Sequence, residues 1–230
     1  MADGEVAEGV ASADDRALTY LEVRDANGPL VIHNHGRPSS RLEARLLADF
    51  ASKSRLRLIC VDRPGMGQSS PQTARSYSGW ADDLVTLADA LGYHEFGVTG
   101  WSEGGPRALA AAGYIDPLRL RHVGSIADGS YGTFGDNWAA NHLSKVDAFG
   151  GTRALRFLYR SWAFDVATIE RPVHMWLGLD DRLVPDPINR AAAERMPGAV
   201  WHPVEGTGHF VAVGAGDDVF AIAAEELGAA

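Results

Sequence analysis

One serine of this sequence lies in a setting that suits a nucleophile. Ser102 is the centre of a G-x-S-x-G motif at residues 100–104, which follows a short apolar segment and precedes an alanine-rich helical pattern. Gly100 and Gly104 lack the side chains that would clash where the chain bends sharply, so the motif predicts a tight strand-to-helix turn. A serine hydroxyl attacks a carbonyl only where a neighbouring base takes its proton. The motif alone is equally typical of a helix N-cap, so other residues must decide between the two interpretations.

Two loops further along the chain carry the residue types that would complete this chemistry. Asp180 and Asp181 follow the predicted strand 172–177, and His209 follows the predicted strand 200–204. The carboxyl ends of parallel strands meet at one edge of a sheet, so we expect these loops to lie near Ser102. An imidazole between a hydroxyl and a carboxylate can take the serine proton. Taken alone, an acid in such a loop is typical of a turn cap, and a histidine such as His209 is typical of one hydrogen-bonded to backbone. Taken together, their chain order of serine, acid and histidine favours catalysis.

The elements that must position these residues alternate between strand and helix. We predict strands at 18–23, 29–34, 57–61, 96–99, 122–127, 172–177 and 200–204, and helices at 40–52, 80–91, from 106, at 187–196 and at 219–227. Such alternation is typical of a mostly parallel central sheet with helices on both faces. The fold class is therefore α/β.

Local signals refine the start of the chain. Turn residues at 25–28 separate the first two predicted strands, which we expect to pair as an antiparallel hairpin. Ser40 and Glu43 have the spacing of a capping box at the start of the first helix. The apolar residues expected on the buried face of that helix are Leu42, Leu46 and Phe50.

The domain organisation follows from length and from one interruption of the pattern. A chain of 230 residues fits one large domain, 1–230, with residues 1–15 as a flexible tail. The alternation is lost over residues 129–171, which we interpret as a short cap insertion. A cap inserted at the carboxyl edge of the sheet would cover the site.

Composition excludes several classes of function. The formal charge of −9 and the pI near 5.3 oppose attraction to phosphate backbones, so nucleic acid is not an expected partner. No apolar run approaches the roughly 18 residues that span a bilayer, so no membrane association is expected.

The acidic N-terminus lacks the features of a signal peptide, which predicts a cytoplasmic location. The other histidines have no metal-binding spacing in the sequence, so we expect neither a metal nor another cofactor. The oligomeric state is left open.

Two further motifs give the chain a resemblance to a known family. Residues 35–38 match an H-G-x-P oxyanion loop, and residues 62–69 match D-x-x-G-x-G-x-S. With the serine motif, these make the chain similar to an α/β-hydrolase of the serine hydrolase or esterase type with a shortened cap. The resemblance covers nearly the whole length.

The resemblance implies a role for each matching residue. Ser102 would be the nucleophile, His209 the general base and then acid, and Asp181 the carboxylate that orients His209. The backbone N–H groups of Arg37 and Glu103 would form the oxyanion hole. The family pattern G-x-x-D-x-x-V-P favours Asp181; Asp180 and Asp128 are the alternatives for the acid.

The expected activity is hydrolysis of a carboxylic ester through an acyl-enzyme intermediate. The substrate would be a small or medium-sized, partly apolar molecule, with Trp101, Trp138 and Trp162 as candidate binding residues. Ordinary core packing is the alternative role for each tryptophan. The alternative function is that of a ligand-binding or non-hydrolytic protein of the same fold, because fold alone does not determine function.

Overall fold

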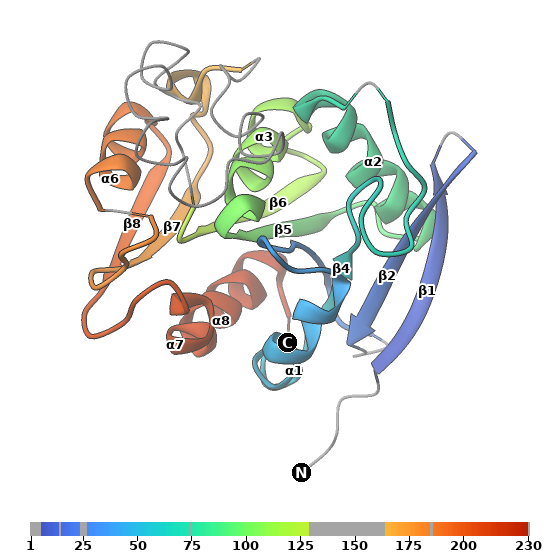
Figure 1. The fold of residues 1–230 in the computed structure, drawn as a ribbon, viewed down its shortest axis with the longest axis horizontal. Coiled ribbons are helices and arrows are strands. Elements are labelled where there is room, and N and C mark those ends of the chain that lie inside the picture. The colour runs from blue at the N-terminus through green and yellow to red at the C-terminus, as the bar shows by residue number, and fades with distance from the viewer. Residues whose placement is uncertain are drawn as a thin grey trace.

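An eight-stranded sheet runs through the centre of the molecule (Figure 1). The computed structural model describes residues 6–13, 15–23, 27–73, 75–128, 164–184 and 186–229. The strands have the spatial order β1-β2-β4-β3-β5-β6-β7-β8. Their bounds are β1 Val6–Ala13, β2 Arg16–Val23, β3 Leu30–Asn34, β4 Arg57–Val61, β5 Phe96–Trp101, β6 Leu120–Ile126, β7 Val173–Gly178 and β8 Ala199–Val204.

Six of the eight strands are parallel to one another. β4, β3, β5, β6, β7 and β8 pair in parallel, whereas β1 and β2 add an antiparallel edge. Every residue of β3, β5 and β7 is buried. Strands covered on both faces need apolar runs rather than alternating patterns, which these segments have. The predicted α/β fold class with a mostly parallel sheet is confirmed.

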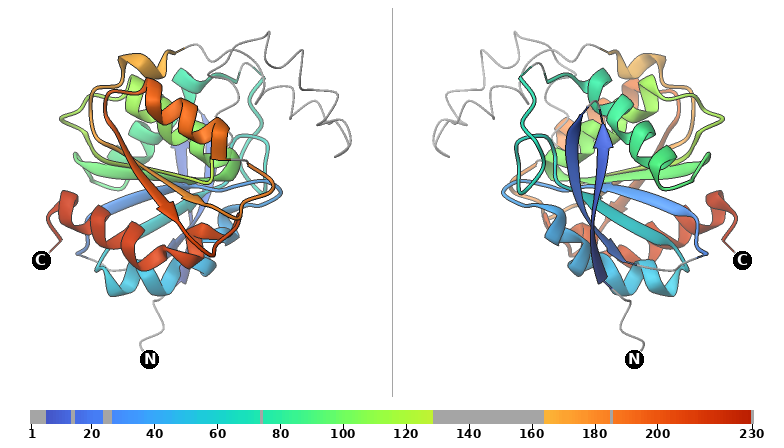
Figure 2. Two further views of the ribbon diagram at one scale, coloured as in Figure 1. Left: turned by 90° about the vertical axis from the view of Figure 1, so that its left-hand side faces the viewer. Right: turned by 90° about the vertical axis from the view of Figure 1, so that its right-hand side faces the viewer.

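Helices cover both faces of the sheet (Figure 2). The bounds are η1 Arg41–Glu43, α1 Ala44–Lys53, α2 Tyr77–Ala90, η2 Ser102–Gly104, α3 Gly105–Tyr114, η5 Val166–Thr168, α6 Asp186–Arg195, α7 Val211–Gly214 and α8 Gly216–Leu227. α1, α7 and α8 lie on one face, and α2, α3 and α6 lie on the other. This arrangement follows from right-handed crossovers between parallel strands.

Each face of the sheet has its own apolar core. On the side of α2 and α3, Leu84, Leu87 and Leu109 pack against β5 and β6. On the side of α1 and α8, Leu47 and Phe220 belong to the core on the opposite face of the sheet. The sheet is thus held rigidly from both sides, which fixes the positions of its carboxyl-edge loops. In the described part of the chain, no helix has the length and apolarity needed to cross a membrane.

Two expectations about the start of the chain are wrong. Residues 6–13, expected within a flexible tail, form β1, which pairs with all of β2 in an antiparallel register. Backbone hydrogen bonds to a sheet edge order this segment despite its weak composition. The expected hairpin between the first two strands is also absent, because β4 lies between β2 and β3 and pairs with both.

The first helix exposes a different face from the one expected. Leu42 and Leu46 are 46% and 53% exposed, and Phe50 is half-buried. The buried residues of α1 are instead Ala44, Leu47 and Ala51. The segment opens with the tighter turn η1, which changes the rotation per residue and shifts the buried face.

Candidate active site

Four loops meet at the carboxyl edge of the parallel strands. They follow β3, β5, β7 and β8 and carry, in that order, residues 35–38, the serine motif, Asp181 and His209. Neighbouring strands of a parallel sheet present their ends at the same edge, and β3, β5, β6, β7 and β8 are neighbours in this sheet. The topology therefore gathers all the predicted catalytic loops.

Ser102 occupies a sharp turn between β5 and α3. Its φ of 55° is in the left-handed region, which a residue with a side chain rarely adopts and which costs about 1–3 kcal/mol. A Cβ on Gly104 would lie 1.9 Å from the carbonyl oxygen of Asn34, and one on Gly100 would lie 2.2 Å from the carbonyl oxygen of Gly104. The turn therefore needs glycine at both positions, and it leaves Ser102 partly exposed.

His209 is hydrogen-bonded to Asp181. The distance from Nδ1 of His209 to Oδ2 of Asp181 is 2.8 Å. The other oxygen of Asp181, Oδ1, accepts the backbone N–H groups of Leu183 and Val184 at 2.8 and 3.0 Å. Burial raises the pKa of Asp181, but the hydrogen bonds from His209 and the backbone outweigh it and lower the pKa overall. Asp181 thus stays ionised and favours the tautomer of His209 that carries its proton on Nδ1.

The two alternative acids lie elsewhere. Asp180 is exposed, and its backbone N–H donates to the carbonyl of Thr207. Asp128 is buried beneath the start of α3, where it accepts a hydrogen bond from the hydroxyl of Ser125. Of the three acids, Asp181 is the one whose side chain bonds to His209 in the described residues.

Trp101 anchors the backbone of the histidine loop. Its indole Nε1 donates to the carbonyl oxygen of His209 at 2.8 Å, and its ring contacts that of Phe210 edge-on at 5.1 Å. The side chain is 5% exposed and packs in the core under α7 and α8. Trp101, one of the candidate binding residues, is therefore nearly buried, and its ring centroid lies 6.2 Å from that of His209. Trp138 and Trp162, like residues 129–163 of the expected cap, lie outside the described residues.

Ser102 and His209 lie on neighbouring segments but are not hydrogen-bonded. Trp101 precedes Ser102 and bonds to the His209 backbone, which ties the elbow to the histidine loop. Among the residues that the structure describes, no hydrogen bond joins the Ser102 hydroxyl to the His209 ring. Catalytic hydrogen bonds are often long or misaligned without substrate and tighten when it binds.

The loop after β3 packs against the serine turn. A Cβ on Gly36 would lie 3.2 Å from the carbonyl oxygen of Trp101 and 3.3 Å from Cβ of Ser102. The N–H of Gly36 donates to the carboxylate of Glu43 at 3.1 Å. The N–H of Gly36 is therefore occupied, and the donor left near Ser102 is the next N–H in the loop, that of Arg37. The Arg37 N–H has no acceptor among the described residues.

The carbonyl of Gly36 is fixed as well. It accepts Nδ1 of His35 at 2.8 Å and Nη2 of Arg63 at 3.2 Å. Burial lowers the pKa of His35 to about 2, and the nearby charge of Arg63 adds to this effect, so His35 is neutral. His35 thus shapes this loop through a hydrogen bond to its backbone.

Glu103 lies in the first turn of η2, directly after Ser102. Backbone N–H groups in the first turn of a helix have no acceptor within that helix, so its N–H is available to a ligand. Its carboxylate is 7% exposed and faces three guanidinium groups. The nearest is that of Arg107, with a hydrogen bond of 3.2 Å. The family resemblance implied the backbone role and gave no sign of this ion cluster.

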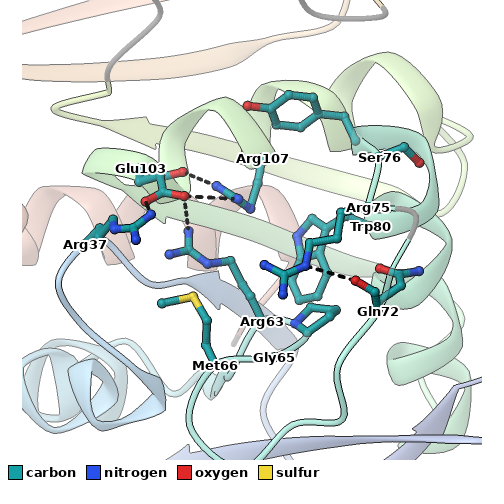
Figure 3. Close-up of a pocket in the computed structure, with 12 residues that line it drawn as sticks. Arg37, Arg63, Gly65, Met66, Gln72, Arg75, Ser76, Trp80, Glu103 and Arg107 are labelled. Carbon is teal, nitrogen blue, oxygen red and sulfur yellow. Dashed lines mark hydrogen bonds and ion pairs between the residues drawn. The ribbon is translucent and has the colours of Figure 1, made fainter. Parts of the chain in front are cut away.

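A cavity of about 380 Å³ opens beside the serine turn (Figure 3). Its lining includes Arg37, Arg63, Arg75, Arg107 and Glu103, which we call the arginine pocket. Apolar side chains, among them Met66 and Trp80, form other parts of the wall. The backbone of the 62–69 loop is held by Asp62, whose oxygens accept N–H groups of Arg41 and Gln68 at 2.7 and 3.1 Å.

A second cluster of titratable side chains lies across β6, β7 and the end of α8. Glu226 accepts Nδ1 of His122 at 2.6 Å and Nε2 of His174 at 3.1 Å, and His174 also contacts His202 at 2.9 Å. The potential ligand atoms of His122, His174 and Glu226 lie within 4.8 Å of one another. Sequence spacing did not indicate this cluster because three separate elements contribute to it.

The comparison with known families agrees with the architecture. Residues 29–128 match the family model of the alpha/beta hydrolase fold. That segment contains β3, the 62–69 loop and the serine turn. By its sheet, its helices and this match, the chain has the α/β-hydrolase fold. A search of curated proteins gave no match.

Solved structures of hydrolases have the same fold over nearly the full chain. A serine-to-alanine variant of the meta-cleavage product hydrolase from Pseudomonas fluorescens IP01 is 18% identical, with 96% of this chain and 97% of that one covered and a TM-score of 0.74. A carboxylesterase from Bacillus subtilis is 17% identical, with coverages of 97% and 92% and a TM-score of 0.72. A hydrolase from Pseudomonas aeruginosa PA01 is 17% identical, with coverages of 97% and 98% and a TM-score of 0.70.

Proposed function

We propose that this protein is a carboxylic ester hydrolase in which Ser102, His209 and Asp181 form a catalytic triad. The observation that carries the proposal is the 2.8 Å bond between His209 and Asp181 at the same sheet edge as the strained Ser102 turn. The similarity of the fold to a carboxylesterase is consistent with it.

The first half of the reaction is acylation. Nε2 of His209 takes the hydroxyl proton of Ser102 while Oγ attacks the ester carbonyl, and Asp181 stabilises the resulting imidazolium. The tetrahedral intermediate then collapses, the alcohol leaves with the proton from His209, and the acyl group stays on Ser102. In the second half, water gives a proton to His209 and attacks the acyl group. The bond between the acyl carbon and Oγ of Ser102 then breaks, His209 returns the proton to Oγ, and the acid is released.

The oxyanion hole is assigned to the backbone N–H groups of Arg37 and Glu103. The N–H of Gly36 is used by Glu43, and the first turn of η2 leaves the N–H of Glu103 without a helical acceptor. Donors fixed in advance stabilise the developing charge most effectively, and losing one typically costs about 100- to 1,000-fold in kcat. Glu43 is therefore a positioning residue for this loop.

The substrate class is a small or medium-sized ester with a partly apolar body. A cavity of about 380 Å³ beside the serine turn is near the lower end of the range for small-molecule sites. Met66 and Trp80 offer apolar surface there. Neither half-reaction needs a cofactor, because the three side chains and two N–H groups supply the proton transfer and the charge stabilisation.

A ligand-binding function without hydrolysis is the second candidate. The observation that favours it is the missing hydrogen bond between the Ser102 hydroxyl and the His209 ring among the described residues. A binding protein would keep the cavity and leave the hydroxyl inactive. It predicts saturable binding of esters without turnover.

The test is a panel of 4-nitrophenyl esters that differ in acyl length, assayed with wild type, Ser102→Ala and Ser54→Ala. The last residue lies at the end of α1, on the opposite face of the protein from α3. We expect Ser102→Ala to lose about 10⁴-fold or more in kcat and Ser54→Ala to keep the wild-type rate. Turnover by Ser102→Ala at the wild-type rate, or no turnover by wild type on any ester, would contradict the proposal.

A further inference from the structure

The arginine pocket concentrates positive charge in an acidic protein. Four guanidinium groups and one carboxylate line the same cavity, which leaves a formal excess of three positive charges there, whereas the chain as a whole carries −9. Glu103 is the only acidic residue of the described lining. Like charges in a partly buried cavity repel strongly because water screens them poorly. Among the described lining residues, positive charge is therefore in excess, which favours the binding of an anion.

Arg63 is the clearest sign of this. Its side chain is 3% exposed, and its one hydrogen bond among the described residues is the 3.2 Å contact from Nη2 to the carbonyl of Gly36. Within the described part of the chain, Nε and Nη1 are buried without a hydrogen-bond partner. Burial and the nearby charge of Arg107 lower the pKa of Arg63 to about 9, so it still carries its proton at neutral pH. A buried cation with free donors is unusual and points to a missing acceptor.

The single carboxylate cannot satisfy the cluster. Glu103 hydrogen-bonds Arg107, but its other two ion pairs are longer: 3.5 Å from Oε2 to Nη1 of Arg37 and 3.7 Å from Oε1 to Nη1 of Arg63. Figure 3 shows these three guanidinium groups around Glu103, with Arg75 reaching toward the same cavity from the loop before α2. In the described residues, the side chain of Arg75 donates a hydrogen bond to the backbone oxygen of Gln72. Planar guanidinium groups are suited to bind carboxylate and phosphate oxygens.

The pocket shares two residues with the proposed reaction centre. Arg37 and Glu103 supply the assigned oxyanion-hole N–H groups from their backbone, while their side chains line the pocket. A substrate whose ester carbonyl lies at Ser102 would therefore place a group a few bonds away among the arginines. Met66 and Trp80 would contact the apolar part between them.

We propose that the arginine pocket binds an anionic oxygen group of the substrate, a carboxylate or a phosphate, so that the enzyme prefers esters carrying such a group. This inference rests on the proposed hydrolase function for its kinetic part. Its binding part does not, because an anion can occupy the pocket without any turnover.

The kinetic test compares 4-nitrophenyl hydrogen adipate with its uncharged methyl ester, and a corresponding pair with a terminal phosphate. We expect kcat/KM to be at least about tenfold higher for the charged member of one pair, as for a charge-assisted hydrogen bond. Arg75→Gln, at an exposed position, and Arg63→Gln should reduce that ratio toward one. Arg45→Gln, exposed on α1 and of the same charge change, should leave it unchanged. A ratio of one or less for both pairs overturns the inference.

The binding test uses Ser102→Ala protein and the free anions adipate and inorganic phosphate at constant ionic strength. An anion that fills the pocket should raise the melting temperature increasingly with its concentration, and Arg63→Gln and Arg75→Gln should abolish the shift. A shift with adipate alone assigns a carboxylate, and a shift with phosphate alone assigns a phosphate. No shift with either, or one that survives both substitutions, overturns the inference. This readout stands even if no ester is hydrolysed.

Discussion

Replacing Asp181 by asparagine separates geometry from protonation in the proposed triad. Oδ1 of Asp181 accepts two backbone N–H groups, from Leu183 and Val184, so the carbonyl oxygen of an asparagine must take that place. Its NH₂ group then faces Nδ1 of His209 at the position now 2.8 Å away. Two donors cannot share a hydrogen bond, so the imidazole must carry its proton on Nε2 instead.

A histidine protonated on Nε2 cannot take the proton of Ser102. We therefore expect Asp181→Asn to lower kcat by about 10⁴-fold, or about 5 kcal/mol of transition-state stabilisation. The magnitude is of the size known for the same change in serine proteases, since both depend on the wrong tautomer. Ground-state binding should change little, because Asp181 does not line the cavity.

The assay is steady-state hydrolysis of the best ester of the panel, with urea denaturation to show that the variant is folded. Asp180→Asn is the matched control, because Asp180 is the exposed neighbour with the same change of side chain. It should retain kcat within about twofold of wild type. An Asp181→Asn enzyme within tenfold of wild type, or a larger loss in Asp180→Asn, would refute this reasoning.

Three further predictions concern stability. Gly104→Ala places its Cβ 1.9 Å from a backbone oxygen and should lower the free energy of unfolding by about 3 kcal/mol. Gly113→Ala, in the following helix α3 and with only ordinary contacts, should raise it by up to about 1 kcal/mol. Equal effects of the two substitutions in urea denaturation would be inconsistent with the close approach at Gly104. Trp101→Phe removes the 2.8 Å bond to His209 and should cost about 1 kcal/mol together with several-fold in kcat, and an unchanged kcat would argue against the anchoring role. Burial alone would raise the pKa of Glu226, but the hydrogen bonds from its histidine partners lower it to about 2. Folded protein then binds protons more weakly than unfolded chain, so stability should fall as pH drops from about 4.5 toward 2; Glu226→Gln should flatten this dependence in denaturation curves at several pH values.

The position of the proposed catalytic loops could be predicted from the sequence because it depends on the order of strands and helices and on few long-range contacts. Strand and helix patterns in the sequence indicated a parallel sheet, and in such a sheet the loops after the strands meet at one edge. Ser102, Asp181 and His209 each follow a strand, so their approach required no knowledge of packing. The tight turn at Ser102 was predictable from the glycines that flank it.

Other features depend on contacts that sequence spacing does not encode. Trp101 was a candidate for the pocket by residue type, but the pleat of β5 turns its ring into the core. β1 is stabilised by backbone pairing with β2, which composition does not reveal. The arginine pocket combines Arg37, Arg63 and Arg107 from three separate segments, so no local motif could indicate it.

Labelling with a fluorophosphonate tests the central claim most directly. Such a probe phosphonylates a serine only when a base activates the hydroxyl and an oxyanion hole accepts the P–O⁻ oxygen. We predict one adduct per chain in folded protein, located by peptide mass spectrometry on Ser102, and a strong reduction of its rate in a His209→Gln variant. No adduct on Ser102 in folded wild-type protein, or labelling at the same rate in His209→Gln, would contradict the account.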